Sequence, residues 1–277
     1  CYKGFFPENR TEKGIGYAFS GLGGILTSSE TPGKWLARYG LANLAVSQVR
    51  KSSSVCEDIF DSQAVHVATA EAVFVDIHKN TDITTKMPDG KEAINEEWLL
   101  WLHSMGGLAG TKFALAHPDE AKMVAMLKTV GINKSILLQI MKSTINGNAV
   151  GAIQHEFLPY VLSDEIELSL KNIARIARHF GVGWPARRDT RPTQSLGEMI
   201  SCLTANTRPV LQKLGEIGTK RLLVEAGRDV LVAPAFDIDA YVDRHVVFPN
   251  YGHMMPQHRP GLIAETILSS RHELQAA

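Results

Sequence analysis

The sequence predicts an α/β protein whose central sheet is mostly parallel, with helices on both faces and an inserted helical cap. The first observation is an alternation of short apolar runs with amphipathic stretches, the pattern of a parallel sheet covered by helices. The second is a break in that alternation between residues 131 and 218, where the patterns are helical. A chain of 277 residues that is 44% hydrophobic can bury a core of this size.

Strands are predicted where a short apolar run is bounded by turn residues. Ile15–Ser20 runs into glycines, and Trp98–His103 is the most strongly apolar of these runs. The predicted strands are Ile15–Ser20, Leu41–Val49, Trp98–His103, Met123–Val130, Arg221–Ala226 and His245–Phe248.

Helices are predicted from apolar residues at helical spacing and from their end signals. Pro118 stops the helix that begins at Gly107, and Asp164 and Gly181 can cap the two ends of a longer one. The predicted helices are Trp35–Tyr39, Gly107–His117, Ser135–Thr144, Asp164–Phe180, Leu196–Leu203 and Gly261–Leu274.

One domain with an insertion accounts for this order of elements. We assign residues 1–130 and 219–277 to the α/β core and residues 131–218 to a helical cap over the site, because the block interrupts two sheet strands. A helix is favoured over Ser62–His78, although Ala72–Ile77 could equally be a strand.

Composition excludes several classes of protein. Lys plus Arg and Asp plus Glu both total 29, and a net charge of zero argues against nucleic-acid or anionic membrane partners. Three cysteines without a CxxC pair argue against a disulfide framework or a zinc site and favour a reducing, cytoplasmic location. Cys1–Arg10 has no signal-peptide pattern, and no run approaches the roughly 18 apolar residues that span a bilayer.

The most informative stretch is an apolar strand that runs into His103-Ser104-Met105-Gly106-Gly107 and a helix with small residues. A nucleophile on such a turn sits in a strained backbone conformation, so its neighbours must be small. The helix that follows points its N-terminus at the serine, which helps to hold a developing oxyanion. Ser195-Leu196-Gly197 is another Ser-x-Gly triplet, but no strand precedes it.

This stretch resembles the nucleophile elbow of the α/β-hydrolase superfamily, whose usual form is Gly-x-Ser-x-Gly. Leu102 replaces the first glycine, and we expect this bulky residue to crowd the turn. The serine argues against the dehalogenase and epoxide hydrolase branches, which carry an aspartate at this place.

The resemblance implies a triad in the chain order serine, acid, histidine. Asp229 follows the predicted strand Arg221–Ala226, and His253 follows His245–Phe248. Imidazole accepts the serine proton near neutral pH, and a carboxylate holds the correct tautomer. His258 is a weaker rival for the base, and we expect His103 and His245 to be structural.

The resemblance also implies an oxyanion hole made by the backbone N–H groups of Leu22 and Met105. Leu22 lies in a glycine-rich turn after the first predicted strand, where Ser20 stands in place of the usual histidine. A second departure is Arg50–Ser54, which lacks the Asp and glycines found in many relatives.

The sequence therefore predicts a serine hydrolase that cleaves a carboxylic ester of a largely apolar small molecule, with no metal and no cofactor. The tail from Gly252 to Leu268 is similar to the aclacinomycin methylesterase group, which favours an esterase. Amide, thioester and C–C bond hydrolysis stay open, as does a homo-oligomer. The alternative is a non-catalytic or weakly catalytic ligand-binding protein on the same fold, suggested by Leu102 and Ser20.

Overall fold

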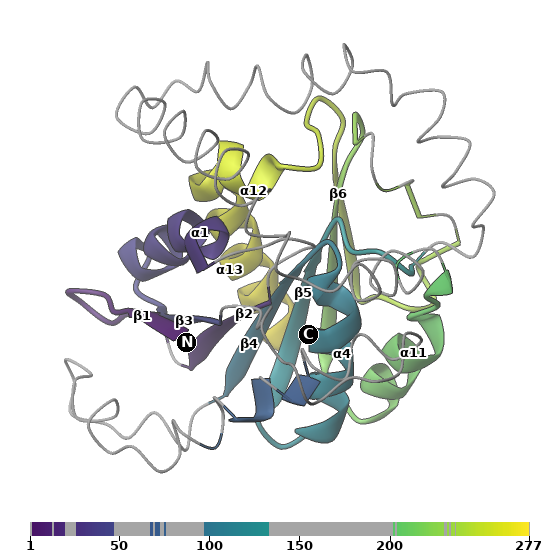
Figure 1. Ribbon diagram of the computed structural model, residues 1–277, viewed down its shortest axis with the longest axis horizontal. Helices are drawn as coiled ribbons and strands as arrows, with labels where there is room; N and C mark the ends of the chain where they lie inside the picture. The colour runs from purple at the N-terminus through teal and green to yellow at the C-terminus, as the bar shows by residue number, and fades with distance from the viewer. Residues whose placement is uncertain are drawn as a thin grey trace, which may run out of the picture.

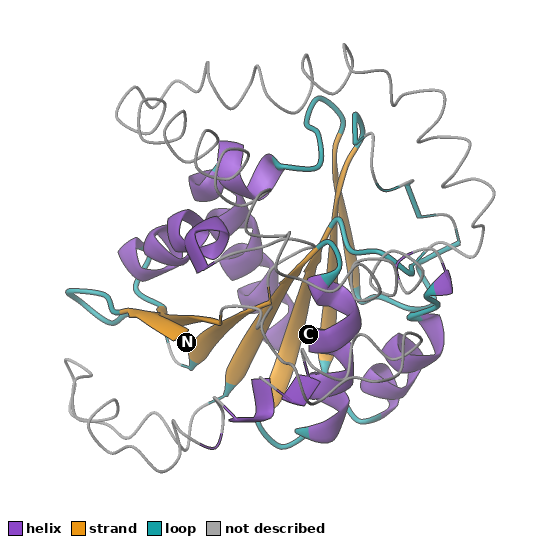
Figure 2. Cartoon of the chain, viewed as in Figure 1, coloured by secondary structure: helices purple, strands orange, loops and turns teal. Residues whose placement is uncertain are grey.

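The computed structural model describes residues 2–12, 14–19, 26–46, 97–132, 204–229 and 237–276, together with 67, 68, 70–72, 75, 202, 232, 234 and 235. These residues form a sheet of seven strands with helices on either side of it (Figures 1 and 2). The predicted α/β class and the helices on both faces are confirmed.

The sheet runs in the order β1-β3-β2-β4-β5-β6-β7. β1 pairs antiparallel with β3, and all other neighbours are parallel. The strands are β1 (Tyr2–Phe5), β2 (Ile15–Phe19), β3 (Ala42–Val46), β4 (Trp98–His103), β5 (Ala121–Leu127), β6 (Lys220–Ala226) and β7 (Arg244–Phe248).

Six of these strands were predicted from their apolar runs, and β1 was not. β1 is only four residues long and lies at the edge of the sheet, so its sequence carries little apolar pattern. The prediction also placed β5 too late, at Met123–Val130. The strand ends at Leu127 because Lys128 turns the chain with a φ of 48°, which strand geometry does not allow.

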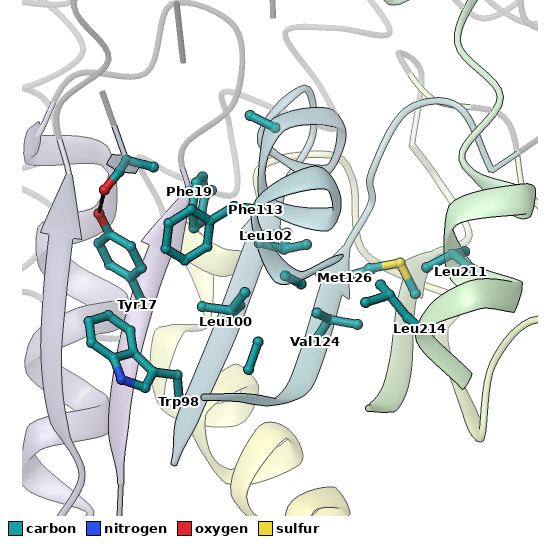
Figure 3. Packing of buried hydrophobic residues seen from close by; sticks show 14 of the residues in the cluster. Tyr17, Phe19, Trp98, Leu100, Leu102, Phe113, Val124, Met126, Leu211 and Leu214 are labelled. Carbon is teal, nitrogen blue, oxygen red and sulfur yellow. Dashed lines mark hydrogen bonds between the residues drawn. The ribbon is translucent and has the colours of Figure 1, made fainter. Parts of the chain in front are cut away.

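The helices cover the two faces separately. They are α1 (Leu26–Arg38), α4 (Gly106–Ala116), α11 (Arg208–Glu216), α12 (Met255–His258) and α13 (Pro260–Ala276). Alternate strand residues point to opposite faces. Leu100 and Leu102 therefore pack with α4 and α11 (Figure 3), whereas Leu99 and Trp101 pack with α1 and α13.

A buried hydrogen bond passes across β2 and ties its two neighbours together. Trp101 Nε1 on β4 donates to Asn43 Oδ1 on β3 at 2.9 Å, and both side chains are buried. The strand between them carries Gly16, and a Cβ there would collide with Asn43 Oδ1. Glycine at this position is thus a packing requirement of the sheet.

α1 is longer than the predicted helix Trp35–Tyr39, because it begins at Leu26 and continues through Pro32. Proline and glycine weaken a helix in isolation, so the packing of α1 on β3 and α13 stabilises a helix that propensity does not indicate. The predicted helix at Gly261–Leu274 is confirmed as the central part of α13.

Much of the predicted cap lies outside the described residues, including the helices expected at Ser135–Thr144 and Asp164–Phe180. α11 also falls within the predicted cap range 131–218, yet Leu211 and Leu214 pack in the same buried cluster as β4 and β5. α11 is thus a layer of the core (Figure 3). The described part of Ser62–His78, between residues 67 and 75, is helical.

Among the described residues, no helix is both long enough and apolar enough to cross a membrane.

Candidate active site

Four polar residues lie at the carboxyl ends of four adjacent strands. Ser104 follows β4, Lys128 follows β5, Asp229 lies three residues after β6, and His253 lies five residues after β7. All four are buried. The carboxyl edge of an open parallel sheet is where α/β proteins place their ligands.

Ser104 occupies a strained turn between β4 and α4. Its φ is 54°, in the left-handed region that favours glycine. The Ser104 N–H donates to the Leu127 carbonyl at 3.1 Å, and the Ser104 carbonyl accepts from the N–H groups of Gly107 and Val130. The turn is thus held by β5 and by the first turn of α4, as a nucleophile elbow requires.

Leu102 does not obstruct this turn in the way that the sequence suggested. Its side chain is fully buried in the cluster beneath α4 (Figure 3). It lies against Gly110, where a Cβ would collide with Leu102 Cδ2. In the usual motif, a glycine two residues before the serine leaves space on the strand. In this chain Leu102 fills that position, and Gly110 on the helix provides the space instead. Ser104 still adopts its left-handed conformation.

The structure brings Asp229 and His253 together, as predicted. His253 Nδ1 lies 2.9 Å from Asp229 Oδ2, and Asp229 Oδ1 accepts the Val232 N–H at 2.8 Å. A carboxylate only accepts hydrogen bonds, so Nδ1 carries the proton and Nε2 is left with its lone pair. This is the tautomer that a general base needs.

Asp229 is held as an anion. Burial alone would raise the pKa of Asp229, but His253 attracts its charge and donates a hydrogen bond to it, and Lys128 and the Val232 N–H add to the effect. The pKa therefore falls well below the usual range for a carboxyl. The carboxylate stays charged at any pH at which His253 titrates.

His103 secures the loop that carries His253. Its Nε2 lies 3.1 Å from the His253 carbonyl oxygen, and the centres of the two rings are 4.9 Å apart. Burial, helped by the charge of His253, lowers the pKa of His103 to about 3. His103 is thus a neutral donor next to Ser104, in agreement with the structural role predicted for it.

The predicted oxyanion hole has two parts, the backbone N–H groups of Leu22 and Met105. Leu22 and Ser20 lie outside the described residues. Met105 directly precedes α4, and the N–H groups of Gly107 and Leu108 donate to the carbonyls of Ser104 and Met105. The Met105 N–H has no acceptor within the described part of the chain and lies at the positive end of the helix.

The other histidines are separate from the triad candidates. His245 Nε2 lies 2.9 Å from Glu225 Oε2 on the neighbouring strand, which explains its position in β7. His258 is buried on α12. His253 differs from His245 in that both it and its acid, Asp229, follow the carboxyl ends of strands and are almost fully buried.

Sequence reasoning missed Lys128 and Glu225, which are buried beside Asp229. The signal was present, since each is a charged residue at the end of an otherwise apolar strand run. In the described segments, no three His, Cys, Asp or Glu side chains lie close enough to share a metal ion.

No protein-family model matches the chain, and no curated protein sequence matches it. Several solved structures are similar to the chain over nearly its whole length. An N-acyl homoserine lactone degrading enzyme is 13% identical, with a TM-score of 0.60 over 97% of this chain and 95% of that chain. A lipase-esterase related protein from Clostridium acetobutylicum is 15% identical, with a TM-score of 0.60 over 97% of this chain and 98% of that chain.

An α/β-hydrolase enzyme from a Medee basin deep-sea metagenome library is 14% identical, with a TM-score of 0.60 over 97% of this chain and 92% of that chain. At these identities the likeness establishes the architecture, and the chain has the α/β-hydrolase fold. The narrower resemblance of the tail to the aclacinomycin methylesterase group stays a prediction.

Proposed function

We propose that the chain is a serine hydrolase that cleaves a carboxylic ester of a largely apolar small molecule through an acyl-enzyme on Ser104. The observation that carries the proposal is the buried Asp229–His253 hydrogen bond at the carboxyl edge of the sheet. The contact from the His103 side chain to the His253 carbonyl holds this pair near the end of β4, which Ser104 follows. Fold likeness alone would not support the activity, because one fold hosts many functions.

In this mechanism Ser104 Oγ attacks the ester carbonyl carbon while His253 Nε2 takes the hydroxyl proton. The oxygen of the tetrahedral intermediate becomes negative and binds the N–H groups of Met105 and Leu22. His253 then gives its proton to the departing alcohol oxygen, which leaves an acyl group on Ser104. Water attacks this ester with His253 as the base, and the acid is released with Ser104 restored.

Asp229 has two effects in this cycle. It orients the imidazole through Nδ1 and stabilises the imidazolium that forms in each transition state. Its carboxylate is already held by Val232 and stays ionised, so no proton passes to it. An ester substrate fits acyl transfer to a serine. One structural neighbour degrades an N-acyl homoserine lactone, and a lactone is a cyclic ester.

A fluorophosphonate probe tests the proposal directly, because it phosphonylates an activated serine and ignores an ordinary one. We expect the wild-type protein to be labelled at Ser104 and to hydrolyse short p-nitrophenyl esters. Ser104→Ala should abolish labelling and reduce turnover at least about 10³-fold. The matched control is Ser269→Ala on the exposed face of α13, which should change neither.

A Ser104→Ala variant that keeps most of its turnover would exclude Ser104 as the nucleophile. A wild-type protein that neither reacts with the probe nor hydrolyses any ester or lactone would favour the non-catalytic alternative instead.

A further inference from the structure

A buried lysine stands between two buried carboxylates directly behind the candidate triad. Lys128 Nζ lies 3.5 Å from Asp229 Oδ2 and 3.7 Å from Glu225 Oε1. The Lys128 side chain is 1% exposed, and those of Glu225 and Asp229 are 7% and 0% exposed. A lysine is almost never buried to this extent unless it is paired.

The backbone is shaped to bring this cation to the site. The Lys128 N–H donates to the Val224 carbonyl at 3.0 Å, so pairing with β6 continues into Lys128 itself. Its φ of 48° then turns the chain in a conformation that favours glycine. A strained, buried, charged residue at the end of a strand next to the acid is a feature that core packing does not require.

Glu225 is fixed on the other side of the lysine. Its Oε1 accepts the Ala235 N–H at 2.8 Å, and its Oε2 lies 2.9 Å from Nε2 of the half-buried His245. Ionisable groups therefore follow one another from His245 through Glu225, Lys128 and Asp229 to His253. Each contact in this row is an ion pair or a hydrogen bond between adjacent strands or their loops.

We propose that Lys128 is a positioning residue that sets the proton affinity of His253 through Asp229, with Glu225 as the opposing charge. The inference rests on the proposed function, because it assigns Lys128 a role in the Asp229–His253 pair. Lys128 touches neither substrate nor Ser104 in this scheme. Lys128 keeps Asp229 negatively charged, and its own positive charge partly offsets the effect of that negative charge on His253.

The sign of the effect follows from electrostatics. The Asp229 carboxylate attracts a proton to His253 and so raises its pKa, whereas a cation behind the carboxylate reduces that attraction. With Lys128 present, His253 is neutral over a wider pH range and is available as a base. Removing the cation should raise the pKa of His253, and removing the Glu225 anion should lower it.

Within the described part of the chain, two further histidines lie near His253 in space or in sequence. His103, from the end of β4, is next to the His253 ring but stays neutral above about pH 3. His258 lies on α12, five residues after His253 along the chain. None of the variants proposed below changes His258, so it cannot cause a difference between them. On the described strands packed behind Asp229, the ionisable groups in the row are Lys128, Glu225 and His245.

The experiment measures the acid limb of kcat/KM for ester hydrolysis and, independently of activity, the NMR titration of the His253 ring. His253→Gln identifies the His253 signal. Lys128→Met should move both midpoints to higher pH by on the order of one unit. Glu225→Gln should move them to lower pH, and Lys128→Arg should restore the wild-type midpoint.

The double variant Lys128→Met/Glu225→Gln removes one charge of each sign and leaves Asp229 and His253 as a neutralised pair. We expect its midpoint to lie near that of the wild type, and it keeps the test open if Lys128→Met fails to fold. The matched control is Lys122→Met, an exposed lysine on the same strand, which should shift neither midpoint.

Shifts of opposite sign in the two single variants would support the positioning role, because a general loss of packing cannot produce them. A midpoint that stays at the wild-type value in Glu225→Gln, and in Lys128→Met where that variant folds, would overturn the inference while Ser104 labelling stands. Absent labelling of wild-type Ser104 would instead overturn the proposed function, and the NMR titration would still decide the electrostatic claim.

Discussion

A Cβ added to Gly110 would collide with Cδ2 of Leu102, so the helix after the candidate nucleophile makes room for the side chain two residues before it. The two residues face each other across the β4–α4 interface, and Figure 3 shows Leu102 beneath α4. The glycine that other nucleophile elbows carry on the strand thus has a counterpart on the helix in this chain. Their pairing explains how an elbow forms despite Leu102.

This pairing predicts that the effect of Gly110→Ala depends on residue 102. In a helix interior, Gly to Ala ordinarily stabilises by roughly 1 kcal/mol. Here the added methyl group overpacks the core, so we expect the free energy of unfolding to fall by about 1–3 kcal/mol. In a Leu102→Ala background the same substitution should stabilise the protein. Urea denaturation of the four proteins measures both effects, and equal changes in the two backgrounds would contradict the pairing.

Asp229→Asn should keep the site folded and slow ester hydrolysis by about 10²–10⁴-fold, because an amide can bind the wrong tautomer of His253. kcat should carry most of the loss, since Asp229 orients the base and does not contact substrate. Asp239→Asn, an exposed residue in the same region, is the control and should have near-normal rates. Near-normal rates in Asp229→Asn would exclude the triad even if Ser104 proved essential.

The rate of ester hydrolysis should have one acid limb, between about pH 5 and 8, because His253 must be neutral to accept the serine proton. Asp229 has a pKa well below this window, so its ionisation should not add a second step there. We therefore expect the logarithm of kcat/KM to fall with a slope of one as the pH decreases. A flat profile down to about pH 4 would show that no histidine acts as the base.

His103 should make the fold sensitive to acid. Burial lowers the pKa of His103 to about 3 from its ordinary value of 6.5, so between these values the unfolded chain binds a proton that the folded protein does not. The free energy of unfolding should therefore fall as the pH decreases from about 6.5 towards 3, by up to roughly 1.4 kcal/mol per pH unit from this group. His103→Asn should flatten that dependence in urea titrations at several pH values, and an unchanged slope would refute it.

Local patterns in the sequence were sufficient to place most of the core. Apolar runs such as Trp98–His103 and Lys220–Ala226 form buried strands wherever the fold puts them, because their side chains favour burial on both faces of a sheet. The order of Ser104, Asp229 and His253 after such strands was enough to predict that all three meet at one edge. That prediction depended on the rule that parallel strands end at the same edge, and it needed no knowledge of side-chain contacts.

Other features were decided by residues distant in the sequence. The run Met123–Val130 does not show where its strand ends, whereas in the structure the chain turns at Lys128, which lies beside Glu225 on β6 and Asp229 after β6. α11 has the same amphipathic pattern as a cap helix, and only packing on α4 and β6 makes it part of the core.

The sequence by itself determined which residues are candidates for the site, because the types Ser, Asp and His and their order along the chain are local information. Only the tertiary structure decided how they are controlled. Leu102 is tolerated because Gly110 lies opposite it, and Asp229 stays charged because His253 and Lys128 surround it. Both outcomes arise from burial and from contacts between separate elements, which no single segment of the chain encodes.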